Sequence, residues 1–136
     1  MRYMLDTNIC IYLLQRQPAG VFEKFARLDF GDAVMSCLTL AELRHGASSG
    51  LAKQRERNMH ALDALLEDIP ALPFDIAAAG AFAELGAGSK LRRSQAIDNL
   101  IAAHAISVGA TLVTNNEKDF RGYAGLQVEN WAAPDK

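Results

Sequence analysis

Four acidic residues stand at positions in this chain where a ligand site can form. They are Asp6, Glu42, Asp98 and Asp119. Two of them follow short apolar runs with strand character, and the other two lie near the start of expected helices. Carboxylates that are brought together repel one another unless a cation neutralises them, and oxygen ligands without histidine or cysteine suit Mg²⁺ or Mn²⁺. An open carboxylate site of this kind is suited to phosphodiester hydrolysis, because bound metal ions activate a water molecule and stabilise charge on the phosphate.

The segment from Ala96 to Phe120 is the clearest unit that holds two of these acids. Apolar residues recur at helical spacing in its first half, and Gly109 stands where a helix ends. Thr111–Thr114 is an apolar, β-branched run that predicts a buried strand, with a polar loop after it. The segment therefore predicts a helix, a tight turn and a strand, with Asp98 near the helix start and Asp119 just past the strand.

The rest of the chain alternates strands and helices. Strands are expected at Met1–Leu5, Ala33–Ser36, Ile69–Phe74 and Leu126–Glu129, the last two short or at a sheet edge. Helices are expected from Ile9 towards Pro18, around Val21–Leu28, at Thr39–Ala47, at Leu51–Glu67 and after Asp75, a candidate N-cap. The alternation predicts an α/β fold with a central parallel sheet of about four or five short strands flanked by helices. Parallel topology would bring the four acids to the carboxyl edge of that sheet, where ligands bind.

The composition is that of one ordinary globular domain spanning residues 1–136. The chain is 50% hydrophobic and 22% charged, with a net charge of −2. Any binding to nucleic acid would need a local basic patch, since the whole chain is not basic. Cys10 and Cys37 are expected to be reduced core thiols. No secretory signal or membrane-spanning run is found, so a cytoplasmic protein is expected.

The run from Ile9 to Leu14 is apolar on all sides of its helix. Such a helix should be covered on more than one face. Either the fold buries it unaided, or a second subunit or a partner helix completes the cover.

Each acid also has an interpretation without function. Asp6 can cap the first helix, and Asp98 can stabilise the positive end of its own. Thr39 and Glu42 have the spacing of a capping box, in which Glu42 reaches back to the Thr39 amide. Asp119 can be a solvated loop residue. The placement of all four at strand ends is what favours a common site.

Three motifs resemble those of the PIN-domain family, and above all its VapC-type toxins from bacterial toxin–antitoxin pairs. They are M-L-D-T-N, S-C-L-T-L-A-E-L-R-H-G and D-N-L-I-A-A-H-A-I-S-V-G-A-T-L-V-T-N-N-E-K-D-F, in that order along the chain. The resemblance implies a Mg²⁺- or Mn²⁺-dependent endoribonuclease that acts on tRNA or rRNA. It also implies a VapB-type antitoxin that blocks the site, a homodimer, and contact with DNA only through the antitoxin.

Carried over residue by residue, the resemblance assigns Asp6 and Asp98 as main metal ligands. Glu42 would bind a second ion or position water, and Asp119 is favoured as the fourth acid. Small polar groups at Thr7, Thr114 and Asn116 would hydrogen-bond around the ions and their waters. The chain departs from the family just before Asp98, where relatives often carry a Gly-Pro loop and this chain reads R-R-S-Q-A-I.

Basic residues next to this departure could follow RNA phosphates. They are Lys90, Arg92 and Arg93. A second basic group, at Lys53, Arg55 and Arg57, has the pattern of a solvated helix face. The histidines receive no ligand role: His104 is expected in the core and His60 on the surface.

Two other classes of protein fit parts of the pattern. A phosphoryl-transfer domain with an aspartyl nucleophile would also gather acids at strand ends, but it is expected to show paired acids where this chain has D-T-N at Asp6. A catalytically inactive PIN-like binding module would keep the acids as caps. Phosphatase and RNA-cleavage assays separate the first class, and metal binding separates the second.

Overall fold

The computed structural model describes residues 2–88 and 95–132 of the chain. The strands are β1 (Tyr3–Leu5), β2 (Ala33–Ser36), β3 (Ala71–Leu72), β4 (Thr111–Val113) and β5 (Val128–Glu129). The helices are α1 (Thr7–Gln15), α2 (Ala19–Ala26), α3 (Cys37–Ala47), α4 (Ala52–Asp68), α5 (Ile76–Gly88), α6 (Ala96–Ser107) and α7 (Glu117–Phe120). Every strand expected from the sequence is present, and the alternation of strands and helices is confirmed.

The five strands form one parallel sheet in the order β3-β2-β1-β4-β5. In this sheet β1 is central, with Tyr3 opposite Ala33 of β2 on one side and opposite Thr111 of β4 on the other. The two prolines around β3 confined it to an edge, as predicted, and β5 forms the other edge. The predicted α/β architecture with a central parallel sheet is therefore confirmed.

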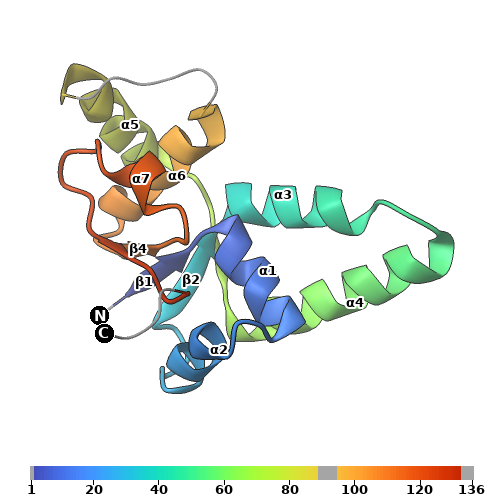
Figure 1. Cartoon of the computed structure of the whole chain (residues 1–136). Helices are drawn as coiled ribbons and strands as arrows, with labels where there is room; N and C mark the ends of the chain where they lie inside the picture. Colours follow the sequence, from blue (N-terminus) through green and yellow to red (C-terminus); the bar gives the residue numbers. More distant parts are fainter. Residues whose placement is uncertain (1, 89–94, 133–136) are drawn as a thin grey trace.

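Successive residues of the central strands point into two separate cores. Met4, Val34 and Leu112 pack on one face of the sheet, while their neighbours Leu5, Met35 and Val113 pack on the other. This is the two-residue period of a strand that is covered on both faces. Side chains of α1, α2 and α4 fill the core on the second face, and α5, α6 and α7 cover the first (Figure 1).

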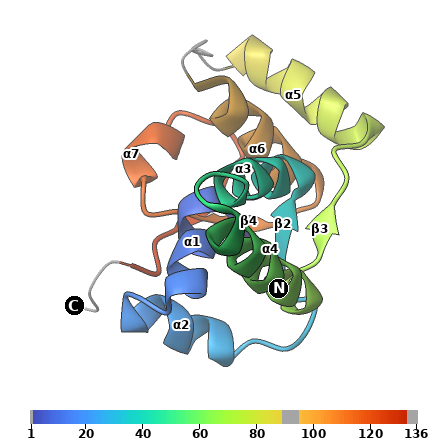
Figure 2. The same cartoon turned by 90° about the vertical axis from the view of Figure 1, so that its right-hand side faces the viewer.

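Helices α3 and α4 form an antiparallel hairpin that projects from the body of the molecule (Figure 1). In Figure 2 the hairpin points towards the reader, with α1 and α2 on one side of the sheet and α5 on the other. The base of the hairpin is anchored in the core by Leu43 of α3 and Leu62 of α4, which are 6% and 1% exposed. The free end of the hairpin lies far from both cores.

Three local features follow the sequence-based expectations. Asp75 caps α5, since its carboxylate accepts a hydrogen bond from the Ala78 amide at 3.0 Å. Gly109 ends the turn after α6 with φ of +68°, a conformation that favours glycine. Cys10 is buried in the core as expected and neither cysteine is bonded to another, but Cys37 is only half-buried, which differs from the expected core position.

Two elements differ from expectation. Helix α3 begins at Cys37 rather than Thr39, because the Ser36 hydroxyl caps it by accepting from the Leu38 amide at 3.1 Å. The short helix α7 replaces the expected polar loop after β4.

The apolar run of α1 is fully buried on one face, and Ile11 and Tyr12 are half-buried against the same core. Ile9, Cys10 and Leu13 are buried against the sheet, whereas Leu14 is 36% exposed. Within residues 2–88 and 95–132, no helix combines the length and the apolar character needed to cross a membrane.

Candidate active site

Four carboxylates meet at the carboxyl edge of the parallel sheet. Asp6 comes directly after β1, Glu42 lies in the second turn of α3, and Asp98 lies in the first turn of α6. Asp119 belongs to α7, which follows β4. The fold thus brings together residues that are up to 113 positions apart in the sequence. We call these four residues the acidic cluster.

Asp6 is the most enclosed member of the acidic cluster, with 7% of its surface exposed. It caps α1, as its carboxylate accepts a hydrogen bond from the Ile9 amide at 3.0 Å. Burial raises the pKa of Asp6, hydrogen bonds from Thr114 and Ile9 lower it, and the charges of Asp98 and Glu42 raise it further. The net result is a raised pKa. The capping hydrogen bond favours the charged carboxylate, but burial and the neighbouring negative charges outweigh it.

The pKa of Asp98 is also raised. Burial raises its pKa first, followed by the negative charges of Asp119 and Glu42. Among the groups that shift the pKa of Asp98 or Asp6, none is a lysine or arginine. The acidic cluster is therefore one set of interacting negative charges without a basic counter-ion among the described residues.

Glu42 is held by a hydroxyl at the start of α1. The Thr7 Oγ1 donates to Glu42 Oε1 at 2.5 Å. Glu42 therefore does not close a capping box on Thr39, and that expectation is wrong, because α3 already begins at Cys37 and Thr39 lies buried inside it. Among the described side chains, the Thr39 hydroxyl has no hydrogen-bond partner.

Asp119 and Thr114 are tied to the backbone turn after β4. Asn116 Nδ2 donates to Asp119 Oδ2 at 2.5 Å, and the Thr114 hydroxyl accepts from the Asn116 amide at 2.9 Å. Thr114 is fully buried and also bonds Asp6. The small polar residues named from the sequence therefore all contact a member of the acidic cluster or its supporting turn.

The chemistry of the acidic cluster fits a hard divalent cation. Its donors are all oxygens, and neither histidine nor cysteine shifts the pKa of Asp6 or Asp98. No three Asp, Glu, His or Cys side chains of the described ranges are arranged so that they could jointly hold an ion as they stand. Glu42 and Asp119 each direct an oxygen at a protein donor instead. A cation would relieve the repulsion that raises the pKa of Asp98 and Asp6.

Tyr123 belongs to the surroundings of this site, and sequence reasoning missed it. Its hydroxyl donates to Asn99 Oδ1, next to Asp98. Burial and the charges of Asp98 and Asp119 raise the pKa of this phenol. Its loop, G-Y-A-G, carries no pattern that could have revealed the contact, because the contact exists only after the chain folds.

A buried polar pair links the helices that carry Glu42 and Asp98. His104 of α6, 1% exposed, lies with Nδ1 2.9 Å from Ser36 Oγ, the cap of α3. Burial lowers the pKa of His104, while Asp75 and the Pro73 backbone raise it. The expected core placement of His104 and the exposed position of His60 are both confirmed.

The basic residues proposed to follow RNA lie outside the described residues. They are Lys90, Arg92 and Arg93. In contrast, Lys53, Arg55 and Arg57 are described, and all three are exposed on α4.

A cleft of about 440 Å³ opens beside Glu42, between α1, α3 and α4. Thr7 and Glu42 lie at its wall, and most of the remaining lining is apolar, including Ile11, Leu14 and Leu62. The exposed Leu14 of α1 therefore lines the same cleft as Glu42 of the acidic cluster.

Fold and site together define a small parallel α/β domain with an acidic site at the carboxyl edge of its sheet. Residues 3–126 match the PIN domain family, and the chain belongs to that family. Its sequence is 37% identical to the tRNA(fMet)-specific endonuclease VapC of Shigella flexneri over 134 residues, 97% of this chain and 99% of that protein.

Solved structures agree with this assignment. One is a VapBC2 complex from Rickettsia felis bound to a promoter DNA fragment, with a TM-score of 0.79, 35% identity, and coverage of 96% of this chain and 99% of that one. Another is a DNA-bound VapBC complex from Salmonella typhimurium, with a TM-score of 0.82, 32% identity, and coverage of 96% and 98%. The resemblance noted in the sequence is thereby confirmed over nearly the whole chain.

Proposed function

We propose that this protein is a metal-dependent endoribonuclease, the toxin of a toxin–antitoxin pair, and that the acidic cluster is its active site. The observation that carries the proposal is the electrostatic contact among four carboxylates from four separate elements. The names of the relatives support the reaction class, since the Shigella flexneri protein is called an endonuclease and the Rickettsia felis one a ribonuclease.

Asp6 and Asp98 are the proposed holders of a Mg²⁺ ion, with Mn²⁺ as the alternative. Both have oxygen donors and both have a raised pKa from burial and neighbouring charge. When bound, such an ion supplies an activated water and stabilises charge on the attacked phosphate. The chain contributes the rigid placement of the two carboxylates, one at a helix cap and one in a first helical turn.

Glu42 is proposed to position the attacking water or to hold a second ion. Its Oε1 is fixed by the Thr7 hydroxyl, so its other oxygen can face the site in a defined direction. Asp119 is proposed as the fourth acid, with Asn116 orienting its carboxylate. Thr114 is proposed to hold Asp6, the carboxylate it already hydrogen-bonds.

The proposed substrate is a structured RNA, with tRNA as the first class to test. This follows the printed specificity of the Shigella flexneri relative. The roles of Lys90, Arg92 and Arg93 as phosphate contacts remain a prediction, and the sequence R-R-S-Q-A-I just before Asp98 differs from the family pattern.

The proposed regulator is a VapB-type antitoxin that blocks the site, with DNA bound only through the antitoxin. The apolar cleft beside Glu42 and the exposed Leu14 offer surface for such a partner. The solved structures of relatives are VapBC complexes bound to DNA, and in the Rickettsia felis complex the DNA is a promoter fragment. We further propose a cytoplasmic homodimer.

Cleavage of bulk tRNA by the purified, antitoxin-free protein tests the proposal. The expected result is discrete fragments with Mg²⁺ or Mn²⁺, none with a chelator, and none with Asp98→Asn. The matched control is Asp75→Asn, which changes an acid outside the acidic cluster and keeps a capping side chain. It should cut at the unmodified rate. Undiminished cutting by folded Asp98→Asn protein, or cutting that survives chelation, would refute the proposed site.

A further inference from the structure

The free end of the α3–α4 hairpin carries a concentration of positive charge. We call residues 44–57 the hairpin tip. It contains four lysines and arginines and one acid, so its formal charge is +3 in a chain whose net charge is −2, and the rest of the chain carries −5. The four cations are Arg44, Lys53, Arg55 and Arg57, and all are exposed. The hairpin tip is thus positively charged in a chain whose remaining residues are acidic in sum.

Charge is also divided along α4 itself. Lys53, Arg55 and Arg57 lie in its first six residues, whereas the second half carries Asp63, Glu67 and Asp68 and no lysine or arginine. A solvated helix face usually mixes the signs so that side chains three or four positions apart attract one another. Here Lys53 and Arg57, four positions apart, repel, and Glu56, three positions after Lys53, is the one acid among the three cations. A solvated helix face accounts for the exposure of these side chains but not for the excess of positive charge.

The position of these cations is unfavourable for the helix that carries them. A helix N-terminus bears a partial positive charge, so acids stabilise it and cations destabilise it. The first turn of α4 contains no acid, and Leu51 at its N-cap offers no side-chain hydrogen bond. Among the described residues, none of the four cations of the hairpin tip makes a side-chain hydrogen bond or ion pair. Local stability does not account for the three cations of α4, whereas Arg44 lies in the last turn of α3, where a cation is favourable.

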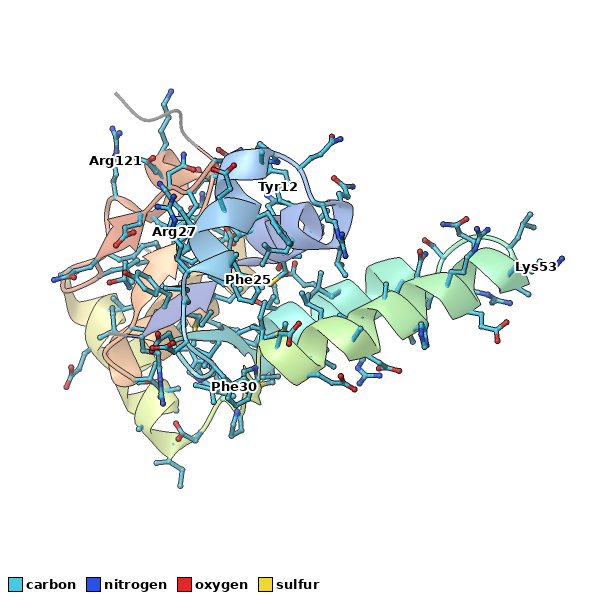
Figure 3. All side chains as sticks on the ribbon, turned by 90° about the horizontal axis from the view of Figure 1, so that it is seen from below. Tyr12, Phe25, Arg27, Phe30, Lys53 and Arg121 are labelled. Atoms are coloured by element: carbon cyan, nitrogen blue, oxygen red, sulfur yellow. The ribbon has the colours of Figure 1, made fainter. Side chains whose placement is uncertain are left out.

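Helix α4 carries three of these cations at the free end of the hairpin, whereas Arg44 lies two residues past Glu42 on α3. Lys53 stands at the outer end of the projection, whereas Arg27 and Arg121 lie on the body (Figure 3). Helix α3 has 11 residues and spans about 16 Å, with Glu42 near its middle. An extended polyanion bound at the acidic cluster can therefore run along the hairpin to its tip.

We propose that the hairpin tip is a docking surface for the RNA backbone, separate from the site of cleavage. This rests on the proposed function, because the RNA it would dock is the one the acidic cluster cuts. A polyanion is the partner that a basic extremity on an acidic protein attracts most strongly. The contact would add affinity for long RNA and leave the cleavage step itself unchanged.

RNA affinity of a non-cleaving protein tests this directly. Lys53→Gln and Arg57→Gln are introduced together into the Asp98→Asn chain, and binding of fluorescently labelled tRNA is followed by anisotropy at several salt concentrations. Removal of two phosphate contacts is expected to weaken binding roughly tenfold and to reduce the slope of log affinity against log salt by about 1.4. Glutamine is a good helix former, so the melting temperature should stay equal or rise.

The matched control is Arg2→Gln with Arg27→Gln in the same background. It removes the same charge from exposed positions outside the hairpin, since Arg2 directly precedes β1 and Arg27 lies on the body (Figure 3). The proposal predicts little change in this control. Equal losses in both double variants, or no loss in either, would overturn the docking surface. A tip variant that loses antitoxin binding but keeps tRNA affinity would assign the surface to a protein partner and overturn it as well.

The two proposals fail in different ways. If the unmodified chain cuts tRNA and the tip variant binds it normally, only the docking surface is refuted. If the unmodified chain binds tRNA through the hairpin tip but cuts no RNA with either metal, the docking surface stands and the nuclease proposal falls.

Discussion

Asp6 and Asp98 carry their negative charge in surroundings that disfavour it. Burial is the largest cause of the raised pKa at both, and other carboxylates add to it. A charge that makes the folded state less stable gives the fold no advantage, but it is what a cation-binding site requires. The raised pKa of these two carboxylates at the sheet edge is thus the property of single residues that supports the proposed activity.

Asp98→Asn should stabilise the metal-free protein in a pH-dependent way. The folded-state pKa of Asp98 is raised above its unfolded value of about 3.9, so the folded state holds the proton more tightly. Below both pKa values the carboxyl is neutral and resembles asparagine, and the two proteins should be equally stable. As pH rises from about 4 through the folded pKa, the unmodified protein loses stability relative to the variant, which should melt a few degrees higher at pH 7.

Melting curves of both proteins in chelator from pH 3.5 to 7.5 measure this difference. The contributions of the other titrating groups to the pH dependence of stability cancel in this comparison, because both proteins contain those groups. A variant that melts lower at pH 7, or a difference that does not change with pH, would show that Asp98 does not experience the repulsion described.

Thr7→Val should slow RNA cleavage by orienting Glu42 less well. The substitution keeps the size of the side chain and removes the hydroxyl that donates to Glu42 Oε1. One hydrogen bond to a charged group corresponds to about 1.5 kcal/mol or more, so kcat should fall about tenfold with a small change in KM. Thr7→Ser is the control, because it keeps the donor. Equal kcat for the valine and serine variants would remove the Thr7–Glu42 bond from the mechanism.

Helices and strands position the site through contacts that join distant elements. Ser36 ends β2, caps α3 and meets His104 of α6, so one hydroxyl ties together the helices that carry Glu42 and Asp98. The Pro73 backbone also bonds His104, which connects the segment after β3 to the same point. The relative position of α3 and α6 thus depends on a small buried polar network.

Ser36→Ala should lower the free energy of unfolding by about 2 kcal/mol. It removes the cap of α3, worth about 1 kcal/mol, and leaves the ring nitrogen of buried His104 without its partner. Urea denaturation measures the loss. Ser48→Ala is the control, since the exposed Ser48 hydroxyl bonds only the nearby His45 carbonyl. A loss no greater than that of the control would mean that the buried pair does not stabilise the protein.

Most of the secondary structure was predictable because apolar periodicity and glycine or proline punctuation mark it locally. Thr111–Thr114 predicted β4, and Asp75 predicted the start of α5. The start of α3 was not predicted correctly, because Thr39 and Glu42 have the spacing of a capping box, whereas the N-cap is Ser36. The partner of Glu42, Thr7, comes from 35 residues away, and only the folded chain shows it.

The same limit applies to the site as a whole. The four acids could be named from motif and strand-end position, since parallel topology leaves few other arrangements. Tyr123 could not be named, because its contact with Asn99 depends on how the loop after α7 folds back over α6. Sequence patterns therefore located the charges and the small polar residues Thr7, Thr114 and Asn116 beside them, while Tyr123 required the structure.

The whole molecule places its acidic and basic regions in distinct locations. The carboxyl edge of the sheet gathers the acidic cluster, and Lys53 of the hairpin tip stands at the outer end of the projection (Figure 3). The sheet order puts central β1 between β2 and β4, and these three strands lead directly into α1, α3 and the turn before α7. One sheet thereby sets the spacing of Asp6, Glu42 and Asp119, and α6 adds Asp98.

The central claim is that the acidic cluster binds a divalent cation. The most direct measurement is an anomalous difference map from crystals of the antitoxin-free protein grown with Mn²⁺. The account predicts a peak among the four carboxylates, next to the oxygens of Asp6 and Asp98, and no such peak in Asp98→Asn crystals. Crystals grown in excess Mn²⁺ that bind manganese only elsewhere, or that show no peak at the carboxyl edge of the sheet, would contradict the account.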